Sequence, residues 1–133
     1  MKFKKIAFTA YAVSDIPKAR AFYEGVLGFK PNSEYDGSGE DVQWVEYDLG
    51  PDTIGIGKSD DWKPSEDGAS VALEVDDFDG YVEMLKKKKV AFRMGPYDWP
   101  SCKMVVIQDP DGNRITLHHK KPLKKATKKS KKK

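Results

Sequence analysis

The chain has 133 residues, of which 38% are hydrophobic and 34% are charged, and its formal net charge at pH 7 is +3. This length predicts one domain whose core is large enough to fold without a metal or a disulfide. The single cysteine, Cys102, has no partner for an intramolecular disulfide, which favours a reducing, cytoplasmic compartment. Because no apolar run reaches the length of a bilayer span, we expect no membrane helix.

The first elements are a strand over residues 6–13 and a helix over residues 16–27. The basic start followed by a short apolar run superficially matches a secretory signal, but it leads directly into a helix cap at Asp15, which favours the strand. Pro17 suits the first helical turn, and Gly28 suits the left-handed residue that ends a helix. The spacing of three and four predicts a buried face made of Ile16, Ala19, Phe22, Tyr23, Val26 and Leu27.

The same outline returns 62 residues later, where Val75, Asp77 and Phe78 match Val13, Asp15 and Ile16. We expect Asp76 or Asp77 to cap a second helix that ends near Lys89, with Lys86 to Lys89 at the negative end of its dipole. Its predicted buried stripe consists of Phe78, Tyr81, Val82 and Leu85.

Turn residues separate the remaining predicted strands. In the first half the strands are 30–35, 42–49 and 53–58, with turns at 37–39 and 50–52. In the second half they are 69–75, 92–94, 103–108 and 113–119, with a loop at 95–101 and a turn at 109–112. The sequence therefore predicts an α+β domain over residues 1–119 with two βαβββ modules, about 4–58 and about 69–119, joined by a linker over about 59–68.

The paired helix signatures, the strand Val-Ala-Leu-Glu-Val-Asp-Asp and the motif Asp-Pro-Asp-Gly-Asn-Arg-Ile-Thr-Leu resemble the vicinal oxygen chelate superfamily. This superfamily holds glyoxalase I, extradiol dioxygenases, and fosfomycin- and bleomycin-resistance proteins. The resemblance covers nearly all of residues 4–119. It implies two paired modules whose mixed sheet curls around a cleft, commonly in a homodimer.

Enzymes of this superfamily place a divalent metal on His and Glu side chains of the central strands. Carried over one by one, the ligand positions fall at Phe8, at Gly55 or Gly57, at Ser70 and at Thr116. None of these residues is a usual donor for such ions, so the resemblance implies no standard metal site and we expect no cofactor. The arginine that glyoxalase-like proteins often carry late in the first strand is replaced by Ala12, which weakens the case for glutathione as a substrate.

A displaced site is the alternative. His118 is predicted to share the cleft face with Thr116, and His119 to face the other way, since strand side chains alternate. A site built from His118, Glu46 and Glu74 would supply either metal ligands or a general acid and base. The competing interpretation is that these side chains are ordinary surface or hydrogen-bonded residues.

Without a metal, the predicted cleft is a small-molecule pocket with apolar walls and a few polar groups. The alternative for Trp44 and Met104 is packing in the core or in a dimer interface. Trp62 and Trp99 are predicted in exposed loops, where they could close over a ligand or contact a second copy. The candidate ligand-binding residues are Phe8, Ala10, Trp44, Glu46, Ser70, Glu74, Met104, Thr116 and His118.

Charge is distributed unevenly along the chain. Residues 120–133 hold nine lysines and no acid, which leaves 15 basic and 21 acidic residues, a net charge of −6, in residues 1–119. The tail is predicted to be disordered and is a candidate for non-specific contact with nucleic acid or another polyanion. An acidic cleft would favour a cationic or aromatic cationic ligand, although acidic residues often serve only solubility.

Three functions follow from these observations. The first is a metal-free protein that binds a small organic molecule, as a homodimer. The second is an enzyme of the glyoxalase, isomerase or dioxygenase kind with a displaced metal site or none, in which His118, Glu46 and Glu74 are the candidate catalytic residues. The third is a polyanion-binding protein that acts through residues 120–133.

Overall fold

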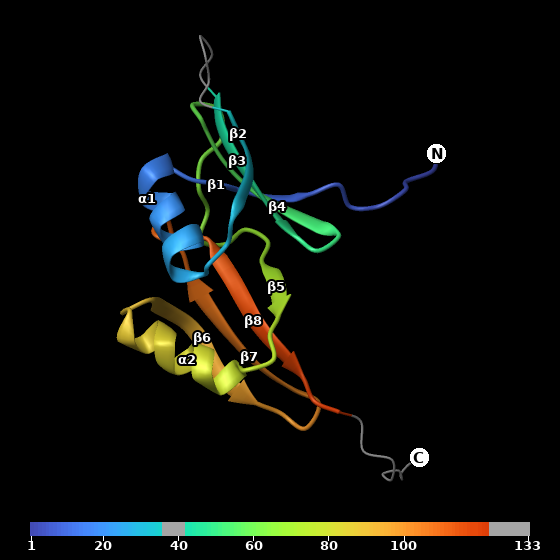
Figure 1. Ribbon diagram of the computed structural model, residues 1–133, viewed down its shortest axis with the longest axis vertical. Helices are drawn as coiled ribbons and strands as arrows, with labels where there is room; N and C mark the ends of the chain where they lie inside the picture. Colours follow the sequence, from blue (N-terminus) through green and yellow to red (C-terminus); the bar gives the residue numbers. More distant parts are fainter. Residues whose placement is uncertain (36–41, 123–133) are drawn as a thin grey trace.

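The computed structural model describes residues 1–35 and 42–122, and Figure 1 shows its two modules stacked along the long axis of the molecule. The first module contains β1 (Thr9–Ala12), α1 (Ile16–Arg20), a π-helical segment (Ala21–Val26), β2 (Pro31–Tyr35), β3 (Val42–Leu49) and β4 (Asp52–Ser59). The second contains β5 (Val71–Glu74), α2 (Phe78–Lys87), β6 (Ala91–Asp98), β7 (Cys102–Gln108) and β8 (Arg114–Lys120). Within the described ranges, no helix is both long and apolar enough to cross a membrane.

Each module forms one mixed, four-stranded sheet with the same topology. The strand order is β1-β4-β3-β2 in sheet 1 and β5-β8-β7-β6 in sheet 2. In both, the first strand pairs in parallel with the last, and the other neighbours are antiparallel. The predicted α+β class with two βαβββ modules is confirmed.

The helix caps form where the sequence predicts them. The Asp15 carboxylate accepts from the Lys18 amide at 3.0 Å, and Asp77 rather than Asp76 caps α2 by accepting from the Gly80 amide at 3.1 Å. Gly28 ends the first helical region with a φ of 78°. At the end of α2 the left-handed residue is Lys89, with a φ of 58°.

One face of each sheet carries the hydrophobic core, and in Figure 1 both helices lie on the same side of the sheets. We call this the covered face and the opposite one the open face. Because strand side chains alternate, the two faces are set by residue parity. The covered face and its helices bury Tyr11, Val13, Ala19, Phe22, Tyr23, Val45, Tyr47, Ile54, Ile56, Phe78, Val82, Leu85, Val105, Ile107, Ile115 and Leu117.

The Asp-Pro-Asp-Gly-Asn turn joins the two modules. The buried Asp109 carboxylate accepts from the Tyr23 hydroxyl and from the Asn113 side-chain amide, both at 2.8 Å. The Asn113 amide also donates to the Ala12 carbonyl at 2.8 Å, and the Ser14 hydroxyl donates to Asp111 at 2.5 Å. The motif that carries the resemblance therefore connects the start of β8 to β1 and to the first helical region.

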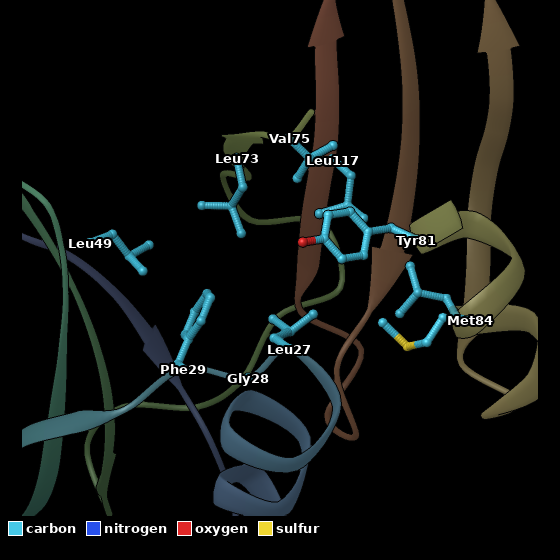
Figure 2. A pocket seen from close by; sticks show the side chains of 10 residues that line it. Leu27, Gly28, Phe29, Leu49, Leu73, Val75, Tyr81, Met84 and Leu117 are labelled. Carbon is cyan, nitrogen blue, oxygen red and sulfur yellow. The ribbon is translucent and has the colours of Figure 1, made fainter. Parts of the chain in front are cut away.

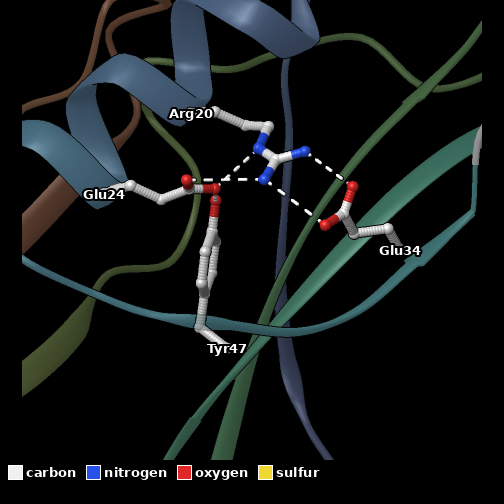
Figure 3. A network of polar contacts seen from close by, with 4 residues as sticks. All are labelled: Arg20, Glu24, Glu34 and Tyr47. Carbon is white, nitrogen blue, oxygen red and sulfur yellow. Dashed lines mark hydrogen bonds and ion pairs between the residues drawn. The ribbon is translucent and has the colours of Figure 1, made fainter.

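A second polar network fastens α1 to sheet 1 (Figure 3). Arg20 contacts Glu24 at 2.6 Å and Glu34 at 2.8 Å, and the Tyr47 hydroxyl donates to Glu24 at 2.8 Å. Burial alone would raise the pKa of Glu24, but the hydrogen bonds from Arg20 and Tyr47 outweigh it and the net pKa is lowered. The network links the first helical region to β2 through Glu34 and to β3 through Tyr47.

Three expected boundaries differ from those observed. The first strand begins at Thr9 rather than residue 6, and the helix predicted over 16–27 becomes π-helical after Arg20. The expected loop at 95–101 is strand up to Asp98: the ladder shifts register after Met94 and resumes with Tyr97 opposite Met104. The Gly-Pro pair at 95–96 led to the prediction of a loop, but in the structure it lies at an irregularity inside the strand. The turn at 37–39 and residues 123–133 of the tail lie outside the described residues.

The buried tyrosines predict a loss of stability in alkali. Burial raises the pKa of Tyr11, of Tyr23 and of Tyr47, all of which have hydroxyls inside hydrogen-bond networks. Since their folded-state pKa values exceed the unfolded value of about 10, the unfolded chain releases protons first, and stability falls as pH rises above about 10. Each tyrosine that stays protonated in the folded chain contributes up to about 1.4 kcal/mol per pH unit in that range.

Urea unfolding measured between about pH 9 and pH 11 should show this slope. Tyr23→Phe removes one of the three groups, so its slope should be about a third shallower. Equal slopes for the two proteins would mean that Tyr23 ionises as readily in the folded chain as in the unfolded one.

Candidate functional site

An aromatic platform lies on the open face of sheet 1. The Trp44 ring lies across Gly55 and Gly57, which pair with Glu46 and Trp44 itself in the β3–β4 ladder. A Cβ at Gly55 would fall inside the indole, and one at Gly57 would lie 2.9 Å from it, so both positions need glycine. The indole nitrogen donates to the Glu46 carboxylate at 2.8 Å, and the Phe8 ring meets the indole edge-to-face at 5.3 Å.

Trp62 extends this platform from the segment that follows β4. Its ring edge would lie 2.8 Å from a Cβ at Gly57, and the residue is 37% exposed. The prediction that Trp62 lies in an exposed segment agrees with this position. The indole edges of Trp44 and Trp62 therefore converge over the same glycine.

On the open face of sheet 2, the central pair is made of hydroxyls. Ser70 and Thr116 lie 2.9 Å apart, oxygen to oxygen, and Ala72 and Val106 flank Thr116 in the ladder. Thr116 is only 8% exposed, and its hydroxyl has a hydrogen-bond partner in Ser70. The two hydroxyls use each other as partners.

A histidine and a carboxylate form the next row of the same face. Glu74 and Met104 are the ladder neighbours of His118, and the His118 Nδ1 atom lies 2.6 Å from Glu74. The second Glu74 oxygen accepts from the Lys120 amide at 2.7 Å. The hydrogen bonds from His118 and Lys120 lower the pKa of Glu74. His119 lies on the other side, with Nδ1 2.8 Å from the Val75 carbonyl oxygen.

Sequence reasoning missed Tyr97 because that residue fell in an expected loop. Tyr97 pairs with Met104, so it joins the row of His118 and Glu74 on the open face. Its ring stacks on Trp99 with centroids 4.8 Å apart and an interplanar angle of 10°. Register shifts on both sides of Met94 break the period of two in this strand, so no regular sequence pattern indicated the position of Tyr97.

A cavity of about 390 Å³ lies between the two modules. Its lining includes Phe8 from the segment before β1, Asp52 from β4, and Ala72 and Glu74 from β5, together with apolar side chains of both modules. Of the nine candidate ligand-binding residues, Phe8 and Glu74 line this cavity directly. Ala10 lines a smaller cavity of about 200 Å³ beneath Trp62.

The residues at the expected metal positions do not fit a divalent ion. Phe8 and Gly55 carry no donor, and the Trp44 ring fills the space above Gly55. Ser70 and Thr116 are weak donors that bond to each other. The alternative trio is not assembled either, because Glu46 is held by Trp44 while Glu74 is held by His118; the described residues contain no cluster of three His, Cys, Asp or Glu side chains suited to a metal.

Two βαβββ modules with one helix-covered face and one open face define the class of paired βαβββ proteins. The family model of the Glyoxalase/Bleomycin resistance protein/Dioxygenase superfamily matches residues 5–117, and the chain belongs to this family.

Solved structures of the same fold are similar to this chain along most of its length. A glyoxalase family protein from Enterococcus faecalis is 26% identical with a TM-score of 0.70, covering 89% of this chain and 99% of its own. TnmS3, an antibiotic binding protein from Streptomyces, is 25% identical with a TM-score of 0.73, covering 91% and 99%. The fosfomycin resistance protein FosX from Listeria monocytogenes, 16% identical with a TM-score of 0.75 and coverages of 90% and 96%, shares the fold. Among curated proteins, none matches the chain.

The donor set predicts that the protein does not retain a divalent metal. Tag-free protein, purified without chelator and incubated with Zn, Ni, Mn and Fe(II), should carry well below one metal per chain by elemental mass spectrometry. A tag-free design matters because a histidine tag binds these ions itself. One tightly held ion per chain would instead require ligands other than the residues at the four family positions.

Proposed function

We propose that the chain binds a small, planar organic molecule on its open face, without a metal ion, and that a positive charge on the ligand strengthens binding. The observation that carries this proposal is the Trp44 platform. The indole is fixed by its hydrogen bond to Glu46, by the Phe8 ring and by the absence of side chains at Gly55 and Gly57. A fixed aromatic surface stacks a planar ligand at little cost in side-chain entropy.

Charge supports the cationic preference. Residues 1–119 carry a net charge of −6, and the open face holds the carboxylates of Glu46 and Glu74. An indole beside a carboxylate attracts a planar cation through both the ring quadrupole and Coulomb attraction. The similarity to an antibiotic binding protein favours binding over chemistry.

The functional unit in this proposal is a cytoplasmic homodimer, as is frequent in the superfamily. The first eight residues support a second copy as partner, because Phe3 is 86% exposed and Ile6 is 79% exposed in the single chain. A second copy that covered Phe3 and Ile6 would remove their apolar surface from water, which favours association.

Isothermal titration with two probes tests the platform: proflavine, a planar cation, and acridone, a neutral molecule of similar shape. Trp44→Ala should weaken both about tenfold, which corresponds to about 1.4 kcal/mol of lost stacking. Glu46→Gln keeps an acceptor for the indole but removes the charge, so it should weaken proflavine and leave acridone unchanged.

Trp99→Ala is the matched control, since it removes an indole that stacks on Tyr97 rather than on the glycines. Equal losses in Trp44→Ala and Trp99→Ala would contradict the assignment of the site to sheet 1. If the wild-type protein bound neither proflavine nor acridone, the proposal itself would be contradicted.

A second function, catalysis by proton transfer, is favoured by the His118–Glu74 pair. A carboxylate at 2.6 Å orients the imidazole and leaves Nε2 for a substrate on the open face. Glu46 takes no part in this version, because it is bonded to Trp44. The polyanion-binding alternative depends on residues 120–133, mostly outside the described residues, and stays a prediction.

Should a screen of hemithioacetals and catechols give turnover, His118→Ala is expected to lower kcat by about 10²- to 10⁴-fold, the usual contribution of a general base. His119→Ala is the control, because that neighbouring imidazole is bonded to the Val75 carbonyl on the other side of the strand. A His118→Ala protein with full turnover would remove the pair from any mechanism.

A further inference from the structure

A third cavity lies between the modules on the covered side, as Figure 2 shows. Its volume is about 310 Å³, at the lower end of the range of small-molecule pockets, about 300 to 1,000 Å³. One wall comes from the end of the first helical region and from β3, and the other from β5, α2 and β8. The lining residues are Leu27, Gly28, Phe29, Leu49, Leu73, Val75, Tyr81, Met84, Leu85 and Leu117.

This inter-module cavity is distinct from the site proposed above. Leu73 and Leu117 are ladder partners, and they alternate along their strands with the open-face residues Ala72 and Thr116. Side chains of opposite parity project to opposite faces of a sheet. A ligand in the cavity would therefore lie on the covered side of sheet 2, opposite the His118–Glu74 row, although Leu49 and Leu73 also border the 390 Å³ cavity.

The lining is uncharged and contains a single polar side chain. The Tyr81 hydroxyl projects toward the middle of the cavity, facing Leu27 and Leu73 (Figure 2). It makes no hydrogen bond with any residue in the described part of the chain, in contrast to the hydroxyls of Tyr11, Tyr23 and Tyr47. An apolar occupant would satisfy the walls, and one acceptor atom on it would satisfy the phenol.

The position of Tyr81 also departs from the amphipathic pattern of α2. The helical spacing predicts Tyr81 in the buried stripe with Phe78, Val82 and Leu85, yet it is 44% exposed while those three are 5% or less. Tyr81 therefore occupies a position that the helical pattern assigns to the core, but its side chain is not covered by neighbouring residues. At about 310 Å³, the cavity is much larger than the space that a single water needs.

We propose that the inter-module cavity binds a neutral, mainly apolar molecule with one carbonyl or ether oxygen, which accepts a hydrogen bond from the Tyr81 hydroxyl. A charged group is disfavoured because no lining side chain is charged. Met84 adapts to the shape of the occupant, since its unbranched thioether side chain changes rotamer easily.

The test uses prodan, a neutral naphthalene ketone whose emission shifts to the blue in apolar surroundings. Wild-type protein should bind it with such a shift. Tyr81→Phe keeps the ring and removes only the hydroxyl, so binding should weaken about fivefold, the typical effect of one hydrogen bond. Met84→Trp fills the cavity from the exposed side of α2 and should abolish binding; Leu27→Trp, from the opposite wall, repeats the test if α2 is perturbed.

Two controls locate the binding. Tyr97→Phe removes a tyrosine hydroxyl outside the cavity and should leave prodan affinity unchanged. Trp44→Ala should weaken the binding of proflavine but not that of prodan. The experiment can therefore contradict the open-face proposal and this proposal independently. Circular dichroism and the thermal midpoint verify that each variant is folded.

Unchanged prodan binding in both Tyr81→Phe and Met84→Trp would overturn the proposal. So would a wild-type protein that does not bind prodan, and in that case analytical ultracentrifugation of wild type and Met84→Trp identifies the reason. A dimer that dissociates on the Met84→Trp substitution would assign the cavity to a contact between copies of the chain.

Discussion

The relative placement of the two modules depends on one buried carboxylate. Asp109 accepts four hydrogen bonds: from the Tyr23 hydroxyl, from the Asn113 side chain, and from the backbone amides of Asp111 and Asn113 at 2.8 and 2.9 Å. Burial nevertheless dominates, and the pKa of Asp109 is raised. A carboxyl group in such a place is stabilised only while all its partners stay in position, so it keeps the turn rigid and, through Tyr23, holds it against the first module.

Local rules were sufficient for most of the fold. Short-range sequence patterns were enough to predict the helix caps at Asp15 and Asp77 and the left-handed conformation of Gly28. The repeat of the module was visible in the same way. Residue parity also placed His118 and His119 on opposite sides of β8, because that strand has no irregularity. The errors occur where the chain departs from regular geometry, as at the register shift after Met94.

The site was only partly predictable for a different reason. The sequence indicated that Trp44 and Glu46 share a face, but not that their side chains bond to each other, nor that the indole lies across Gly55. That arrangement depends on which rotamer fills the space that glycine leaves, and this is a property of the packed sheet. The pairing of His118 with Glu74 rather than with Glu46 likewise depends on which strands are neighbours.

The glycine beneath Trp44 also limits the order in which this sequence can change. Because a Cβ at Gly55 would occupy the same space as the indole, any side chain introduced there requires that Trp44 be replaced by a smaller residue first. A carboxylate at this position is therefore not reached by a single substitution: the intermediate with both side chains would be strained, and the viable intermediate would have lost the platform. Binding by the indole and ligation by a side chain at position 55 are mutually exclusive states of one sheet surface, separated by at least two ordered steps.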